Sequence, residues 1–312
     1  MENFRKIGIV GAGLMGHALA QMFSLQGYTV NLFDRDQEIL DQVPKKVRGN
    51  LKAFIELGLV NEFEAEACVN NIALCRDIKD IYRSEDCIII EAVSENLDVK
   101  KSIFAELENI TSPETILTSN TSAISITEIS RDLKFRERVV GTHFWNPPHI
   151  VPCVEVIRSE FTSQETFQTV LTFLKKAGKE PVSVLKDIPG FLGNRMQHAL
   201  WREAISLVEK GIATAEDIDR VVKFSFGLRL AFIGPLETAD LAGLDLTLDV
   251  QKDLFPELEN STNPSEMLTG MVERGETGVR TGKGFYEWSQ ERIKQKISQR
   301  DHVLLKILNE VF

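Results

Sequence analysis

Short apolar runs and longer amphipathic stretches alternate along the first 190 residues of the chain. Short aliphatic or β-branched runs predict strands, and apolar residues at helical spacing predict the helices between them. This alternation is typical of an α/β fold with a parallel sheet. The predicted strands are 6–10, 29–33, 72–75, 87–90, 116–118, 139–143, 154–157 and 182–184. The predicted helices beyond the second strand are 37–57, with an irregularity at Pro44, then 61–70, 97–107 and 164–177.

The pattern changes to helices alone after Gly190. Residues 191–210 carry apolar side chains at helical spacing, and Gly211 predicts the end of that helix. Thr214 with Asp217 resembles a capping box, with Asp in place of Glu, and predicts the start of the next helix. We therefore predict a first domain over 1–187, a helical domain over 188–288 and a charged helical tail over 289–312.

A glycine-rich turn follows the first predicted strand. Gly11 allows the tight turn, Gly13 lets the backbone approach a pyrophosphate, and Gly16 lets helix and strand pack closely. The N-terminus of the next helix offers free N–H groups and the positive end of its dipole to phosphates. This context predicts a dinucleotide site. Its loop residues are Gly11, Gly13, Leu14, Met15 and Gly16.

An acidic residue at the end of the second predicted strand selects the dinucleotide. Asp34 is placed to accept hydrogen bonds from the 2′-hydroxyl of an adenosine ribose. Arg35 follows and could pair with a 2′-phosphate, which leaves some use of NADP open. The neighbouring carboxylate would repel that phosphate, so the sequence favours NAD.

Composition narrows the class of protein. A chain of 312 residues, 43% of them hydrophobic, is long enough for about two domains. The net charge of −10 argues against a nucleic-acid partner. The N-terminus leads directly into a strand and no apolar run approaches ~20 residues, so neither a signal peptide nor a membrane span is expected. The four cysteines lack metal-ligand spacing, which predicts free thiols, no metal and a cytoplasmic location.

Polar residues interrupt four stretches where core residues would otherwise stand: SNTSA at 119–123, THFWNPP at 142–148, VEV at 154–156 and GFLGNR at 190–195. Oxidation of a secondary alcohol needs a base for the hydroxyl proton while hydride leaves to nicotinamide. Histidine suits that task, since its ordinary pKa is ~6.5, and a carboxylate on its other nitrogen stabilises the imidazolium. Ser122 and Asn194 can orient the substrate oxygen.

Taken together, the motifs resemble those of the L-3-hydroxyacyl-CoA dehydrogenase family. GAGLMG, SNTS, HFWNP, VEV, PGFxxNR, GPL…AGLD and GKGFYEW occur in family order over residues 3–288. The resemblance implies a Rossmann-type, doubly wound parallel sheet that binds NAD. It also implies an all-α C-terminal domain that forms a homodimer, and a place in fatty acid metabolism.

The resemblance also implies roles for individual residues. His143 matches the catalytic histidine, Glu155 its carboxylate partner, and Ser122 and Asn194 the residues that hold the substrate oxygen. Arg280 stands where the family usually has a lysine near the cofactor. The residues that match contacts on the nicotinamide side are Glu95, Lys100 and Asn146.

Three departures from the family pattern concern the substrate. Pro152 replaces a lysine, and Glu56–Leu57 stand where lysines are common on the helix that contacts CoA, although Lys52 is close. Arg229, in GLRLAFIGP, could pair bidentately with a free carboxylate. A similar stretch occurs in the lambda-crystallin/L-gulonate dehydrogenase group and in carnitine dehydrogenases, and NPPH resembles a dehydrogenase of pyridoxine breakdown.

Three functions are therefore compared. The first choice is interconversion of a short (S)-3-hydroxyacyl-CoA, such as 3-hydroxybutyryl-CoA, with its 3-ketoacyl-CoA. The alternative is an NAD-dependent dehydrogenase of a small free 3-hydroxy acid, L-gulonate- or carnitine-like, held by Arg229. The third is a non-catalytic dinucleotide sensor or crystallin-like protein, which the presence of His143, Glu155 and Asn194 disfavours.

Overall fold

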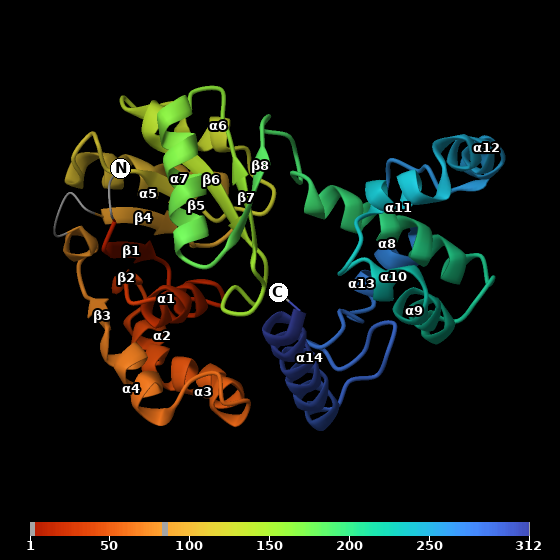
Figure 1. Ribbon diagram of the computed structural model, residues 1–312, viewed down its shortest axis with the longest axis horizontal. Coiled ribbons are helices and arrows are strands. Elements are labelled where there is room, and N and C mark those ends of the chain that lie inside the picture. Colours follow the sequence, from red (N-terminus) through yellow and green to blue (C-terminus); the bar gives the residue numbers. More distant parts are fainter. Residues whose placement is uncertain (1–3, 83–86, 312) are drawn as a thin grey trace. The chain divides into compact units, whose positions relative to one another are not determined.

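A computed structural model describes residues 4–82 and 87–311 of the chain. It contains two compact units. The first comprises Met1–Asn194 together with Ile297–Phe312, and the second comprises Arg195–Lys296. Figure 1 traces the sheet of the first unit from red to green and the helical second unit from green to blue.

The first unit is built on one eight-stranded sheet in the order β3-β2-β1-β4-β5-β6-β7-β8. The chain moves outward from β1 through β2 to β3, then returns to the other side of β1 with β4. This reversal is the feature at which doubly wound sheets bind dinucleotides. The strands are β1 (Lys6–Val10), β2 (Thr29–Phe33), β3 (Ile72–Cys75), β4 (Cys87–Glu91), β5 (Leu117–Ser119), β6 (Val139–Phe144), β7 (Cys153–Ile157) and β8 (Glu180–Val184).

One neighbouring pair of strands, β6 with β7, is antiparallel, and the other neighbours are parallel. The sequence predicted a doubly wound parallel sheet, which the structure confirms apart from this one pair. The difference has a simple cause: residues 145–152 join the two strands, and a parallel crossover needs a dozen or more residues. In this pair His143 lies directly opposite Glu155.

Helices cover both faces of the sheet. Along β4, Ile88 and Ile90 belong to one core cluster and Ile89 to another, because successive side chains point to opposite faces. Phe23 of α1 joins the first cluster and Phe104 of α5 the second. The helices of this unit are α1 (Gly16–Leu25), α2 (Gln37–Asp41), α3 (Val43–Glu56), α4 (Glu62–Asn70), α5 (Leu97–Ile110), α6 (Ile126–Ser130) and α7 (Gln164–Lys176), with 3-10 turns η1 (Ile78–Ile81) and η2 (Arg136–Arg138).

The predicted helix over 37–57 is two helices, α2 and α3, separated at Gln42. Pro44 lies in the first turn of α3. A proline there loses no helical hydrogen bond, whereas inside one long helix it would remove one. Asp36 caps α2 by accepting hydrogen bonds from the N–H groups of Glu38 and Ile39.

The second unit is helical. Thr214 caps α9 by accepting from the N–H of Asp217, as the sequence predicted. The helices are α8 (Gly193–Glu209), α9 (Ala215–Phe224), α10 (Phe226–Arg229), α11 (Pro235–Ala242), α12 (Leu244–Leu254) and α13 (Glu266–Glu273), with a 3-10 turn η3 (Phe255–Glu257). The last helix, α14 (Gln290–Val311), contributes residues to both units.

The boundary between the units lies after Asn194, whereas the sequence placed it after residue 187. Hydrogen bonds explain the difference. Asp187 accepts from Ser125 and Thr127, and the N–H groups of Leu192 and Gly193 donate to Glu155, so this segment stays with the sheet.

The second half of α14 packs on the first unit instead of forming a separate tail. Leu305 is buried in a small cluster with Phe54 of α3 and Ile150, and Leu304 and Leu308 pack against it. We call this cluster, together with its partly buried neighbours, the α14 cluster. Burial of these leucines holds the end of the chain against α3.

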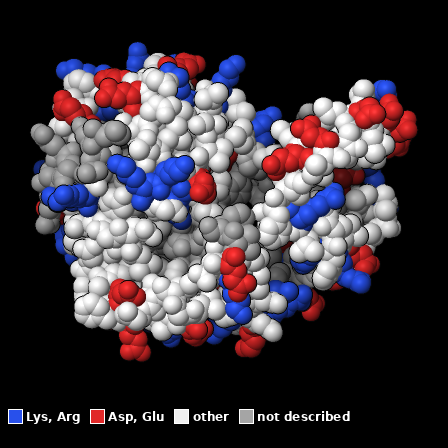
Figure 2. Space-filling model, viewed as in Figure 1, with Lys and Arg blue, Asp and Glu red and all other residues white. Residues whose placement is uncertain are grey.

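The helices, cysteines and surface charges of the described residues bear on where the protein could reside. Among the residues described, no helix has both the length and the apolar character needed to cross a membrane. Cys68 and Cys153 are free thiols, and Cys75 and Cys87 are buried. Acidic and basic side chains are interspersed on the face drawn in Figure 2.

Candidate active site

The turn between β1 and α1 has the geometry of a phosphate-binding loop. Gly11 adopts φ +103°, which favours glycine. A Cβ on Gly16 would lie 1.7 Å from the carbonyl oxygen of Gly11, whereas a Cβ on Gly13 would meet nothing within 4 Å. No side chain caps the N-terminus of α1. Open space beside Gly13 and an uncapped helix N-terminus fit the pyrophosphate of a dinucleotide.

Asp34 follows β2 and is held against the same loop. Its Oδ2 accepts from the N–H of Ala12 at 2.7 Å, and its Oδ1 accepts from the N–H of Asp36 at 2.9 Å. An ionised carboxylate has about four acceptor positions, so two remain for ribose hydroxyls. The residues present therefore fit NAD.

His143 and Glu155 form a buried pair across the β6–β7 ladder. His143 Nδ1 lies 2.7 Å from Glu155 Oε2, and the two residues are 5% and 2% exposed. Burial alone would raise the pKa of Glu155, but hydrogen bonds from His143, Gly193 and Leu192 bring that pKa below its ordinary value. Because the carboxylate is ionised, Nδ1 carries the proton. His143 Nε2 is then the nitrogen with a free lone pair.

The second oxygen of Glu155 connects this pair to the start of α8. Oε1 accepts from the N–H of Leu192 at 2.8 Å and from the N–H of Gly193 at 2.9 Å. A Cβ on Gly193 would lie 2.2 Å from the indole of Trp145, whose ring centroid is 5.2 Å from that of His143. Only glycine fits between the strand end and the indole. One carboxylate oxygen of Glu155 therefore orients His143, and the other fixes the first turn of α8.

Asn194 and Ser122 lie at the same end of the sheet. The side-chain amide of Asn194 donates to the carbonyl of Ser122 at 3.0 Å. Ser122 is exposed, and its hydroxyl has no hydrogen-bond partner among the described residues. The structure thus links four predicted residues in one chain of contacts, from His143 through Glu155 and the start of α8 to Asn194 and Ser122.

A second buried network lies beside the loop after β5. Lys100 Nζ contacts Glu91 Oε1 at 2.7 Å and Glu95 Oε2 at 3.5 Å. Glu95 Oε1 accepts from the hydroxyl of Thr121 and from the N–H groups of Ser122 and Ala123. Sequence reasoning missed Glu91. The signal was present in the run CIIIE, where a charged residue ends a fully buried strand.

Comparison with known proteins identifies the family. The family model described as 3-hydroxyacyl-CoA dehydrogenase, NAD binding domain, matches residues 6–188, and the model of its C-terminal domain matches residues 190–288. The chain belongs to the 3-hydroxyacyl-CoA dehydrogenase family. Like the family, it is an NAD-dependent oxidoreductase.

Individual relatives of this dehydrogenase differ in substrate. A 5-formyl-3-hydroxy-2-methylpyridine 4-carboxylate 5-dehydrogenase from Mesorhizobium japonicum is 32% identical over 97% of both chains. A crystal structure of an enzyme of that description, called an NAD+-dependent dismutase, has a TM-score of 0.90 at 31% identity over 97% of both chains. The (S)-3-hydroxybutyryl-CoA dehydrogenase of Ralstonia eutropha has a TM-score of 0.76 at 33% identity, over 92% of this chain and 100% of that chain.

Of the remaining predicted residues of the dehydrogenase, Leu14, Asn146, Arg229 and Arg280 are exposed, and Met15 is half-buried. Asn146 follows β6 in the first unit, three residues after His143. Arg229 ends α10 and Arg280 lies between α13 and α14, both in the helical unit. Neither guanidinium pairs with a carboxylate within the described part of the chain. Both arginines are therefore free to meet an anion.

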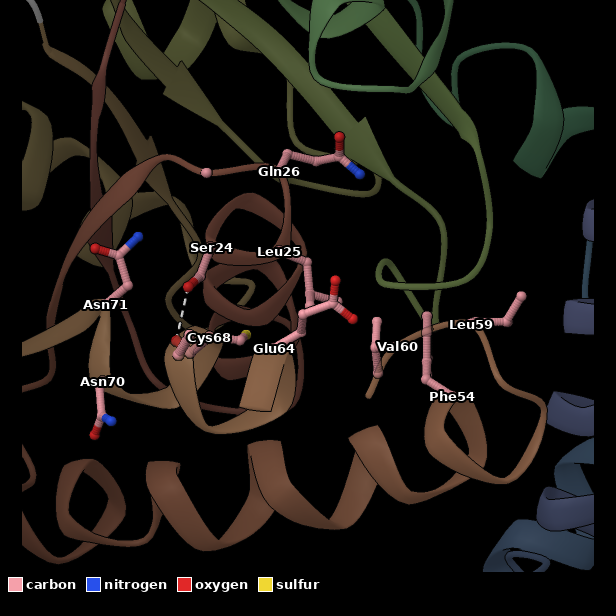
Figure 3. A pocket seen from close by; sticks show the side chains of 12 residues that line it. Ser24, Leu25, Gln26, Phe54, Leu59, Val60, Glu64, Cys68, Asn70 and Asn71 are labelled. Atoms are coloured by element: carbon pink, nitrogen blue, oxygen red, sulfur yellow. Dashed lines mark hydrogen bonds between the residues drawn. The ribbon is translucent and has the colours of Figure 1, made fainter. Parts of the chain in front are cut away.

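The dehydrogenase also has an open pocket of about 830 Å³ between the end of α1, the α3–α4 connection and α4. Figure 3 shows its polar and apolar lining, including the hydrogen bond from the Ser24 hydroxyl to the Cys68 carbonyl. Among the described residues that line it, Glu64 alone is charged, and none is a predicted catalytic or cofactor residue. This pocket is separate from the site described above.

His149, in the loop between β6 and β7, lies beside the α14 cluster. Its ring centroid is 6.1 Å from that of Phe54, and its Nδ1 is buried without a partner among the described residues. Burial, and then the positive charge of His17, Lys179 and Arg300, lowers the pKa of His149 from 6.5 to about 4. The folded protein therefore disfavours the charged imidazole.

We expect His149 to make the dehydrogenase less stable as pH falls from 6.5 to 4. In this window the unfolded chain binds a proton that the folded chain does not, so the free energy of unfolding decreases by up to about 3 kcal/mol. Urea unfolding at several pH values should show a flatter pH dependence for His149→Leu than for the parent. His198→Gln, in the exposed part of α8, is the control and should keep the parental slope. An equal slope in His149→Leu and the parent would contradict this expectation.

Proposed function

We propose that His143 is the base of a hydride-transfer reaction between NAD and an alcohol carbon. The observation that carries this proposal is the 2.7 Å contact between His143 Nδ1 and the ionised Glu155. It leaves Nε2 to take the hydroxyl proton as the carbon loses hydride and becomes a carbonyl. Bound NAD supplies the hydride acceptor. Glu155 then stabilises the imidazolium, and the Ser122 hydroxyl and Asn194 amide hold the substrate oxygen.

We further propose that the substrate is a small free 3-hydroxy acid and not a CoA thioester. In typical thioester members, the helix after the second strand contacts CoA through a basic cluster. Here that helix is α3, and Phe54 near its end is covered by Leu305 of α14. The match to the family model ends at residue 288 of this chain, and α14 lies beyond the matched residues. At the end of α3, an apolar contact and the exposed Glu56 stand where lysines are common in those members, although Lys52 lies one turn earlier.

Two further observations support a free carboxylate. Arg229 is exposed and unpaired with any carboxylate in the described part of the helical unit, and its planar fork suits a carboxylate. The Mesorhizobium relative, which covers 97% of the chain, is named for a free pyridine carboxylate. A short (S)-3-hydroxyacyl-CoA remains the second candidate, favoured by the family description and by the Ralstonia enzyme.

A substrate panel distinguishes the two candidates. We expect kcat/KM with NAD and free 3-hydroxy acids to exceed that with matched CoA thioesters by at least about 100-fold, which corresponds to about 2.7 kcal/mol of lost contacts. Arg229→Met should raise KM for the acid about 100-fold with little change in kcat, since it removes a bidentate ion pair, and Arg229→Lys should recover part of the loss. Efficient turnover of acetoacetyl-CoA with NADH, and none of the free acids, would favour the thioester instead. NADP measured in parallel tests the role of Asp34.

We also propose that the protein forms a homodimer in the cytoplasm. Phe224, Leu236 and Leu241 of the helical unit are 80%, 80% and 77% exposed. Apolar exposure of this extent is typical of surfaces that associate. The free thiols of Cys68 and Cys153 suit a reducing compartment.

A further inference from the structure

Glu91 lies where the sheet topology places the nicotinamide half of the cofactor. It ends β4, the strand beside β1 at the point where the strand order reverses. Dinucleotides bind outside the carboxyl ends of the strands at such a point, one half on each side. Asp34, after β2, serves the adenosine ribose. The half formed by β4, β5 and β6 therefore receives the nicotinamide.

Glu91 organises three donors in this half although it is fully buried. Its Oε1 accepts from Lys100 Nζ and from the N–H of Val93, both at 2.7 Å, and its Oε2 accepts from the hydroxyl of Ser119 at 2.6 Å. Lys100 is 1% exposed, and its ammonium is also 3.5 Å from Glu95. Lys100 is therefore covered from solvent and contacts one buried carboxylate, Glu91, and one exposed carboxylate, Glu95.

The charges of Glu91, Glu95 and Lys100 do not sum to zero. Glu91 and Glu95 contribute two negative charges and Lys100 one positive charge, which leaves one negative charge in excess. Glu95 carries this excess at the surface, because its side chain is 42% exposed. Burial would raise the pKa of Glu95, but hydrogen bonds from Thr121, Ala123 and Ser122 and the charge of Lys100 bring that pKa below its ordinary value.

We propose that Glu91 is a positioning residue and that the Glu91–Lys100–Glu95 triad shifts the relative affinity of the site from NADH toward NAD+. The oxidised nicotinamide ring bears a positive charge that the reduced ring lacks. An excess negative charge beside the ring stabilises the oxidised form only. Glu91 sets the size of this excess, since it neutralises Lys100 and leaves Glu95 uncompensated.

Binding measurements on the full chain, without substrate, test the triad. The dissociation constants of NAD+ and NADH are measured by calorimetry, and their ratio, Kd(NAD+)/Kd(NADH), is compared among variants. Glu91→Gln and Glu95→Gln each remove one negative charge and should raise the ratio on the order of tenfold. Lys100→Met removes the positive charge, which increases the excess negative charge by one, and should lower the ratio by a similar factor. The double variant Glu91→Gln/Lys100→Met restores the parental charge and should return the ratio to near its parental value.

A merely structural role for Glu91 gives a different result. It would weaken binding of both cofactor forms alike and leave the ratio unchanged in every variant. The dissociation constants of the double variant would then be no closer to the parental values than those of the single variants. Either result, or a shift in the same direction for Lys100→Met and Glu91→Gln, would overturn the proposal. Glu106→Gln, an exposed carboxylate on the same helix as Lys100, is the matched control and should keep the parental ratio.

Discussion

Replacing His143 with alanine is expected to lower kcat by about 1,000-fold or more, the contribution of a positioned general base. Glu155 is buried behind the imidazole that it holds, so its carboxylate cannot take the substrate proton in place of His143. NADH binding should stay within about twofold of the parent, because the glycine loop and Asp34, which would hold the pyrophosphate and the adenosine ribose, lie on other strands and remain unchanged.

Steady-state kinetics with the best substrate of the panel, together with an NADH fluorescence titration, measure both effects. His198→Ala removes an exposed histidine of α8 and should leave kcat within about twofold of the parent. A His143→Ala variant that retained more than a tenth of kcat would exclude His143 as the base. Loss of NADH binding in that variant would show that the histidine serves the cofactor instead.

Replacing Gly16 with alanine is expected to cost about 3 kcal/mol or more of stability and to abolish tight NAD binding. The new Cβ would lie 1.7 Å from the carbonyl oxygen of Gly11. The carbonyl oxygen is a backbone atom and the backbone fixes the position of the Cβ, so no side-chain rotation relieves the clash. Helix α1 must therefore move away from the end of β1, and the loop loses its shape. Urea unfolding of the protein without cofactor and an NADH titration measure the two consequences.

Gly13→Ala provides the matched comparison. A Cβ on Gly13 meets no protein atom within 4 Å, so stability should change by less than about 1 kcal/mol. The methyl group would occupy space that the pyrophosphate needs, and NAD affinity should fall at least about tenfold. Parental stability in Gly16→Ala, or parental affinity in Gly13→Ala, would contradict the assignment of this loop.

The fold class and the family were predictable because their signals are local. The glycine spacing, the run at 87–90 and the switch to helical spacing after Gly190 each depend on a few neighbouring residues, and the comparisons confirm the family. The antiparallel β6–β7 pair was not predicted. A run of apolar residues specifies a strand but carries no information on its direction, which depends on the connecting loop.

The site was predictable only in part. The structure brings His143, Glu155, Asn194 and Ser122 into one set of contacts, and their roles stay predictions. Glu91 was missed because its importance depends on Lys100 folding back onto it from the next helix. The α14 cluster was missed for a similar reason.

In that cluster, Leu304, Leu305 and Leu308 have the spacing of a helical seam, but their partner Phe54 is some 250 residues earlier in the chain. Local patterns do not encode such a pairing.

Strand register, and not loop length, preserves the pairing of His143 with Glu155. His143 faces Glu155, and the flanking pairs are Thr142 with Val156 and Phe144 with Val154. A slip of one residue would put a valine opposite the histidine and turn the carboxylate to the far side of the sheet. Residues inserted between the two strands would leave the chemistry intact whenever pairing resumes unchanged. During divergence, this connection can therefore vary in length and composition while the dyad is inherited.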